Sequence, residues 1–364
     1  MNYLGIANYY DNRKCAVTLT WDWGLWAQHE SVPLMVSAMV NRNLGYSFGI
    51  VTGYADLDYV QNKVINQSGS LVEICSHSHT HPHTPYADYE KEVKVSRDLL
   101  ISNLKLPDFQ RFAGTEKIYG WIDPYGQSDD NVSDWLRRSG YFWDRGISNG
   151  HYGLADWDIE NKKFRRYDCT VAMGINWGTW NVSWYWKLLP QRKKLALNSW
   201  FDVAYRQNGV YHLYAHPHDC DWSAGSIAHK HLDYISNRKN CWYAPLTALY
   251  LVKYLKTIVA LGVTKVSSPD ETVWTKLTEK TSDDFFNGIE TARWTVGKVY
   301  VSIAFPKNQA MFWLRFEPTG EVFEVWVSPE EFIQYGFQYP FTLEFNITQE
   351  NEVYKGVKAH TDSI

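Results

Sequence analysis

The chain has 364 residues, of which 45% are hydrophobic and 21% are charged, and its formal net charge is -4 at pH 7. This balance is typical of a folded protein with a sizeable core and excludes a disordered or fibrous chain. The mild negative charge and the absence of a long basic run argue against nucleic acid or an anionic membrane as the main partner. No stretch reaches the roughly 18 consecutive apolar residues that a membrane span needs.

Aromatic residues are unusually frequent, with 18 Trp, 25 Tyr and 16 Phe. Their flat faces fill protein cores and also stack on sugars, so the excess is a hint toward carbohydrate. The five cysteines are scattered and form no CxxC pair, which favours buried free thiols over disulfides or a thiolate zinc site. The first residues lack the basic and apolar regions of a signal peptide. We therefore expect either a cytoplasmic protein or an exported form without its signal.

The first third of the chain alternates apolar runs with amphipathic segments. The β-branched run 15–21 predicts a buried strand that ends at Asp22, and 46–53 and 71–75 predict two more strands. Helices are expected over 31–44, 57–69 and 89–106. Strands that alternate with helices pair in parallel, and sites in such sheets form beyond the carboxyl ends of the strands. Asp22 and the residues after position 75 should therefore meet.

Later segments are less regular. We expect a helix followed by a strand within 131–146, a strand over 210–218 and a helix over 244–263. From about residue 268 the pattern changes to period-2 alternation of β-branched and aromatic residues, as in KVYVSIAF and EVFEVWV. The sequence thus predicts an α/β catalytic domain over 1–267 and a β-rich accessory domain over 268–364.

Four histidines occupy alternate positions in 71-LVEICSHSHTHPHT-84. Taken alone, such a run could be a surface loop or an accidental chelating tract. Alternatively, His77 and His81, spaced i and i+4, suit two ligands of one zinc ion, and Asp22 could supply a third. His79 and His83 are then expected to have structural or substrate-facing roles.

Several motifs together resemble the polysaccharide deacetylase family, carbohydrate esterase family 4. The stretch 20-TWDWG-24 is similar to the family's TFDDG, and 77-HSHTHP-82 matches its HSxxH followed by Pro. The stretch 123-DPYG-126 is similar to RxPYG, and 213-LYAH-216 fits LxxH. The likeness covers roughly residues 14–265 in the right order. It implies a distorted (β/α) barrel, followed here by a small antiparallel β-sandwich-like domain.

The resemblance also implies a chemistry. A divalent metal, most often zinc, is expected on Asp22, His77 and His81, where it polarises an acetyl carbonyl and activates a water. His216 corresponds to the general acid that protonates the leaving group. The backbone N–H of Tyr125 is expected to stabilise the developing oxyanion. His212 and His218 compete with His216 for the acid role.

Two departures from the family pattern affect the assignment of roles. Trp23 replaces the Asp that is usually a metal ligand, so Asp22 must be either the ligand or the base, because coordination lowers basicity. Ile122 replaces the Arg of RxPYG, which normally orients the base. Arg111 could reach the site instead, or it could be an ordinary surface arginine. Asp156 is a candidate for the Asp that tunes the catalytic histidine.

Three functions are compatible with these observations. The leading hypothesis is a metal-dependent deacetylase of an N-acetylated (or O-acetylated) polysaccharide or surface glycan. A glycan-binding pseudoenzyme that lost catalysis, or an amidase acting on a small non-sugar C–N bond, are the alternatives. A glycan would need an elongated groove lined by aromatic side chains. Four tryptophans are candidates for this lining, and each could equally be a core residue: Trp121, Trp143, Trp157 and Trp222.

Overall fold

The computed structural model describes the backbone of most of the first 250 residues and of the strands that follow. The described residues are 2–6, 9, 13–24, 30–107, 110–112, 115–155, 157–158, 163–164, 169–172, 190–250, 253, 259–265, 272–279, 293–296, 299–302, 310–317, 322–327, 341–350 and 353–363.

Eight of the described strands form one sheet in which every pairing is parallel. The order across the sheet is β11-β12-β2-β3-β4-β7-β8, and β13 also pairs with β2. This confirms the predicted α/β fold with a parallel sheet. The strands are β2 (Cys15–Trp23), β3 (Tyr46–Ile50), β4 (Val72–Ser76), β7 (Gly120–Ile122), β8 (Trp143–Arg145), β11 (Val171–Ala172), β12 (Val210–Ala215) and β13 (Cys241–Tyr243).

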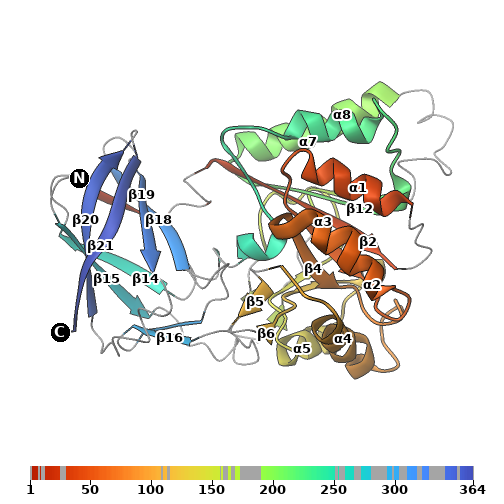
Figure 1. Ribbon diagram of the computed structural model, residues 1–364, viewed down its shortest axis with the longest axis horizontal. Helices are drawn as coiled ribbons and strands as arrows, with labels where there is room; N and C mark the ends of the chain where they lie inside the picture. The colour runs from red at the N-terminus through yellow and green to blue at the C-terminus, as the bar shows by residue number, and fades with distance from the viewer. Residues whose placement is uncertain are drawn as a thin grey trace.

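Helices lie on both sides of these strands: Figure 1 shows α1, α7 and α8 together on one side and α4 and α5 on the other. The helices predicted over 31–44, 57–69, 89–106 and after 131 are all present, although the second and third contain π-helical turns. Their bounds are α1 (Ser31–Val40), α2 (Leu57–Val60), η2 (Gln61–Ile65), α3 (Asn66–Ser68), η4 (Glu90–Val95), α4 (Ser96–Asn103), α5 (Asp130–Arg138), α7 (Pro190–Arg206) and α8 (Ile227–Ile235).

The helix predicted over 244–263 is wrong at its carboxyl end. Residues 246–250 are helical, but Val259–Lys265 form strand β14. The segment VALGVTK is rich in β-branched valine and contains a glycine, both of which favour a strand or disfavour a helix. Strand β14 pairs with β15 (Thr272–Glu279) along nearly its whole length, and this pairing stabilises the extended conformation.

The parallel sheet is strongly curled. Arg145 at the end of β8 bonds to Asp22 on β2, although β8 lies four places from β2 in the sheet order. In a flat sheet these strands would be about 19 Å apart, beyond the reach of one side chain. On its other side Arg145 lies over the ring of Tyr214 in β12, 4.2 Å from its centroid. The side chains therefore converge inside a distorted barrel, as the resemblance implied.

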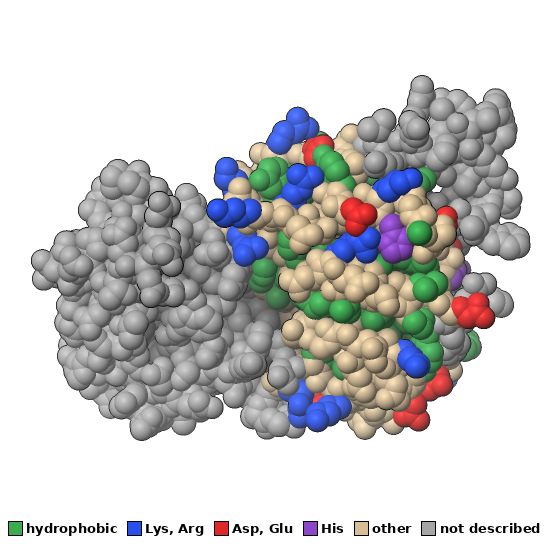
Figure 2. Space-filling view, turned by 45° about the horizontal axis from the view of Figure 1, so that its top comes forward, with side chains coloured by type: hydrophobic (Ala, Val, Ile, Leu, Met, Phe, Trp, Pro, Cys, Tyr) green, Lys and Arg blue, Asp and Glu red, His purple; other side chains and the backbone are tan. Residues whose placement is uncertain are grey.

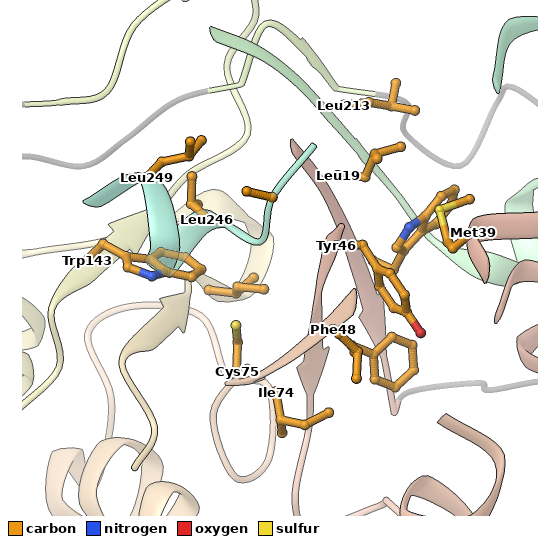
Figure 3. Close-up of a cluster of buried hydrophobic side chains, with 14 of the residues drawn as sticks. Leu19, Met39, Tyr46, Phe48, Ile74, Cys75, Trp143, Leu213, Leu246 and Leu249 are labelled. Carbon is orange, nitrogen blue, oxygen red and sulfur yellow. The ribbon is translucent and has the colours of Figure 1, made fainter. Parts of the chain in front are cut away.

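The amino-terminal end of this barrel is closed by a buried carboxylate. Glu73 accepts hydrogen bonds from the Ser47 hydroxyl at 2.8 Å and from the backbone N–H of Thr247 at 3.0 Å, and the Thr247 hydroxyl also donates to it. Trp143 donates from its indole nitrogen to the same hydroxyl. Figure 3 shows Trp143 beside Leu246 and Leu249 within the buried hydrophobic cluster.

A second sheet is built mainly from the last hundred residues. Its order is β1-β18-β19-β21-β20-β15-β14, antiparallel except for β19 with β21. A separate hairpin joins β16 (Arg293–Val296) to β17 (Val299–Ser302). Both chain ends lie in the body at the left of Figure 1. The predicted domain division after residue 267 stays a prediction; β14 and β1 lie on the amino-terminal side of it. The remaining strands are β1 (Asn2–Ile6), β18 (Ala310–Glu317), β19 (Val322–Val327), β20 (Phe341–Glu350) and β21 (Val353–Ser363).

In the part of Figure 2 that is coloured by residue type, apolar side chains reach the surface at several places among polar ones. None of the described helices has the length and apolar character that crossing a membrane would require.

Candidate active site

Asp22 lies at the centre of the carboxyl ends of the parallel strands. It is the eighth residue of β2 and is fully enclosed, with 2% of its surface exposed. Its Oδ1 accepts a hydrogen bond from the guanidinium of Arg145, which is completely buried. Burial alone would raise the pKa of Asp22, but on balance the pKa is lowered, and the guanidinium charge of Arg145 is the largest cause of this. Asp22 is therefore an ionised carboxylate with one oxygen already engaged.

His77, immediately after β4, faces the other oxygen of Asp22. Its Nδ1 donates to the backbone carbonyl of Ile122 at 2.9 Å, which leaves the lone pair on Nε2. That Nε2 lies 3.5 Å from Oδ2 of Asp22. Burial is the main cause that lowers the pKa of His77, so the ring is neutral. Two ligands of one tetrahedral zinc ion are about 3.4 Å apart, given bond lengths near 2.1 Å, so this spacing suits a shared ion.

His81 is held beside His77 by an irregular backbone. Its φ is 58° and that of Ser78 is 68°, both in the left-handed region where residues other than glycine are uncommon. The Ser78 hydroxyl accepts a hydrogen bond from the backbone N–H of His81 at 2.8 Å. The rings of His77 and His81 meet edge to face, with centroids 4.7 Å apart. Burial and the nearby His77 lower the pKa of His81 to about 3.

A carboxylate from the next helix fixes the loop between these two histidines. Glu92 in η4 is buried, and its Oε2 accepts from the backbone N–H groups of His79 at 2.9 Å and Thr80 at 2.7 Å. Its Oε1 accepts from the Thr80 hydroxyl at 2.6 Å. The His79 ring turns away from Asp22 and bonds to the Thr52 hydroxyl at 3.0 Å. These hydrogen bonds give His79 a structural role, which is one of the two roles expected for it.

Tyr125 lies next to the histidine loop, in the short turn η6 (Pro124–Gly126), and its φ is 56°. Its ring contacts His81 at a centroid distance of 4.4 Å and stacks on His83 at 3.7 Å. His83 in turn pairs with Gln127 at 3.1 Å. The turn that resembles PYG is therefore beside the candidate ligands, with its tyrosine ring packed between two histidines.

His216 follows β12, and the structure gives it a carboxylate partner. Its Nδ1 lies 2.9 Å from Oδ2 of Asp219, and its Nε2 lies 3.2 Å from the Tyr214 hydroxyl. Because Ala215 is the register partner of Trp21, His216 is next to Asp22 just beyond the ladder. Of the two competing histidines, His212 is buried against Thr20. The ring of His218 lies beside that of His216, with centroids 5.2 Å apart, and its Nε2 is 3.7 Å from Oδ1 of Asp219.

Trp23 does not point to this site. Its side chain is buried and stacks on Phe48 and Tyr59, with centroids 5.8 Å and 5.9 Å away. Since neighbouring residues of a strand face opposite sides of the sheet, Trp23 packs in the outer core while Asp22 faces inward.

The other predicted site residues lie in different surroundings. Trp121 and Trp143 are buried core residues with at most 1% of their surface exposed, so neither can stack on a bound sugar. Trp222 packs on Trp21 at 5.6 Å and donates to the carbonyl of Pro217, bracing the turn that carries Asp219. Arg111 pairs with Glu116 at 3.0 Å in a separate hairpin. Asp156 and the side chain of Trp157 lie outside the described residues.

Sequence reasoning missed Arg145, Asp219 and Glu92. Arg145 is the last residue of the strand expected within 131–146, which was a usable signal because strand ends supply site residues. Asp219 stands three residues after His216, within reach of one turn. Glu92 gave no signal, because a charged residue early in an amphipathic helix is usually a solvated one.

The donor set fits a divalent ion. His77 presents a free Nε2 opposite a carboxylate oxygen, and the buried Nδ1 of His81 has no hydrogen-bond partner. Both rings are neutral, as metal binding requires. Among the described side chains, no three His, Cys, Asp or Glu residues already surround a single point. Asp22, His77 and His81 are the residues that would hold such an ion.

No family model and no curated protein matches the chain. Among solved structures, it is similar to a CE4 family pseudoenzyme from Bacillus anthracis, with 14% identity over 66% of this chain and 66% of that chain, and a TM-score of 0.37. The chain thus spans just under two thirds of that protein. It is also similar to a family 4 carbohydrate esterase from Streptomyces lividans in complex with acetate (15% identity, 60% of this chain and 85% of that one, TM-score 0.36) and to a peptidoglycan deacetylase from Bacillus subtilis (13% identity, 67% and 93%, TM-score 0.38).

Proposed function

We propose that the protein is a metal-dependent hydrolase that removes acetyl groups from a glycan. The observation that supports this most directly is the facing pair of His77 Nε2 and Asp22 Oδ2 at 3.5 Å, with the unpartnered Nδ1 of His81 beside it. The two nitrogens and one oxygen are a donor set that suits zinc and leave room for a further ligand. The glycan substrate class rests on the sequence motifs that resemble the polysaccharide deacetylases.

Each of the surrounding residues has a role in this proposal. Asp22, His77 and His81 hold the ion, which would polarise the acyl carbonyl and lower the pKa of a nearby water. Arg145 fixes the orientation of Asp22 through Oδ1. His216 lies at the same end of the barrel and supplies a proton to the leaving nitrogen or oxygen. Tyr125 offers its backbone N–H to the developing oxyanion.

The first experiment is to measure bound metal and acetate release together. The untagged protein is dialysed against metal-free buffer, reloaded with zinc, and compared with His77→Ala. We expect about one zinc per chain in the wild type and none in the variant, with acetate released from acetylated amino-sugar oligomers only by the former. His151→Ala is the matched control, because it removes an exposed histidine outside this run, whose Nε2 pairs with the Ser148 hydroxyl. A wild type that binds no zinc would refute the proposal.

One observation favours a second candidate, a glycan-binding pseudoenzyme. Trp23 occupies the position of a family metal ligand and is fixed in the outer core by Phe48 and Tyr59. A site with one carboxylate could retain the fold and lose the reaction. Binding of acetylated oligomers without acetate release, measured by calorimetry with zinc present, would select this candidate.

A further inference from the structure

The strand that carries Asp22 supplies a single carboxylate to the site, and Arg145 already engages one of its oxygens. The other oxygen faces His77 at the separation of two ligands of one ion. A carboxylate that is bonded to a guanidinium and also coordinates a metal is a poor proton acceptor, because both neighbours stabilise its charged form. Asp22 is therefore well placed to hold an ion and badly placed to take a proton.

The register of the sheet places His216 at the same end of the barrel as Asp22. Ala215 is the register partner of Trp21, so His216 stands beside Asp22 just beyond the paired residues. Arg145 cannot accept a proton. His216, in contrast, is neither a candidate ligand nor permanently charged.

The hydrogen bonds of His216 define which of its nitrogens can accept a proton. Asp219 is an acceptor only, so the Nδ1 at 2.9 Å from it must carry the ring proton. The Nε2 then has the lone pair, and the Tyr214 hydroxyl at 3.2 Å donates to it. A histidine fixed in this tautomer by a carboxylate is the arrangement that makes imidazole an effective general base.

We propose that His216, held by Asp219, takes the proton from the attacking water and later gives it to the leaving group, while Asp22 only holds the ion. This inference rests on the proposed function. In the first step the water oxygen bonds to the acyl carbon, and one water proton moves to Nε2 of His216. In the second step the bond from the acyl carbon to the leaving nitrogen or oxygen breaks, and that proton moves to the leaving atom. The acetic acid that is formed then loses its remaining proton to solvent, which leaves acetate.

Two substrates distinguish whether His216 acts as a general base or only as a general acid. Cleavage of an N-acetyl amino sugar needs both, since an amine leaves only when protonated, whereas 4-nitrophenyl acetate releases a phenolate that needs no proton. If His216 is also the base, His216→Asn should lose at least 100-fold in turnover of both substrates. If His216 is only the acid, the variant would keep ester turnover within about threefold, and the inference is overturned.

Metal binding is measured on the same proteins, independently of turnover. His216→Asn should bind zinc as the wild type does, because it holds no ligand. Asp22→Asn should bind zinc much more weakly, yet at saturating zinc it should retain ester turnover within about tenfold. A zinc-saturated Asp22→Asn protein as inactive as His216→Asn would identify Asp22 as the base and overturn the inference.

Further variants guard against a simple folding defect. Asp219→Asn keeps His216 but permits the other tautomer, so both substrates should slow while zinc binding persists; unchanged ester turnover would count against the inference. His151→Asn is the matched control, since His151 is an exposed loop histidine whose Nε2 pairs with Ser148. A zinc-loaded wild type that hydrolyses neither substrate would refute the proposed function and this inference with it. The other contrary outcomes overturn the inference alone.

Discussion

Arg145 and Asp22 form a buried ion pair across the interior of the barrel, although their strands are four places apart in the sheet. Ile122, which occupies the position of the arginine in the RxPYG pattern, is the register partner of Arg145. The positive charge is thus present near Asp22, but it comes from the next strand at the same level. The Ile122 side chain instead packs near Asp22, over Gly49. A Cβ atom built on Gly49 would lie 2.5 Å from Cδ1 of Ile122 and 3.4 Å from Oδ1 of Asp22.

Replacing Arg145 by Gln should destabilise the protein by about 3–5 kcal/mol, because it leaves the charge of Asp22 buried without a partner. Urea unfolding at pH 7 measures this. Arg111→Gln is the control, since its partner Glu116 forms a partly exposed pair worth about 0–1 kcal/mol. Equal losses in the two variants would contradict the importance of the buried pair.

Replacing Glu92 by Gln should weaken zinc binding by about 10- to 100-fold, the usual effect of removing a partner that orients metal ligands. The amide keeps one acceptor oxygen for the three donors of His79 and Thr80. Zinc titration by calorimetry provides the measurement, with the exposed Glu90→Gln as control. Unaltered affinity in Glu92→Gln would show that the loop keeps its shape without this carboxylate.

Acid should destabilise the protein through His231, which lies away from the site. Its Nδ1 donates to Asn198 and its Nε2 accepts from the Tyr211 hydroxyl, and burial lowers its pKa to about 3. The unfolded chain binds this proton near pH 6.5. The stabilising contribution is therefore complete above about pH 6.5 and is lost as the pH falls toward 3, by up to about 1.4 kcal/mol per pH unit.

Urea unfolding at pH 7.5 and pH 5 tests this sign. His231→Gln should show a smaller drop in unfolding free energy between the two pH values than the wild type. The exposed His83→Gln serves as control and should follow the wild type. An identical drop in all three proteins would mean that His231 is not responsible.

Stability and metal binding should separate at the opposite end of the barrel. Glu73→Gln replaces one of the two carboxylate oxygens by an NH2 group. Either the Ser47 hydroxyl or the Thr247 hydroxyl, which donate to different oxygens of Glu73, then loses its acceptor. We expect a loss of about 1–3 kcal/mol with zinc affinity unchanged within about threefold. Thermal unfolding and zinc titration of the same samples decide; a parallel loss of zinc affinity would mean that the two ends are coupled.

The strands and the candidate ligands could be predicted because their signals are local. The β-branched runs before Asp22 and His77 predict strands, and parallel pairing brings the strand ends together. Arg145 could not be assigned to Asp22, because their contact depends on how far the sheet curls. The burial of Trp121 and Trp143 depends on packing around each strand, and the sequence pattern left both environments open. The β14 strand was missed because its pairing partner lies beyond the predicted domain boundary.

The register of Ile122 and Arg145 also bears on how distant relatives are detected. A motif is a string along one strand, whereas the charge that Asp22 requires can arrive from any neighbouring strand at the same height. If the arginine is lost from one strand and another arginine is present at the same register position of the next strand, the sequence motif is lost but the positive charge near the aspartate is kept. Chains that lack a motif residue should therefore be compared by the register positions of their charged residues in the sheet.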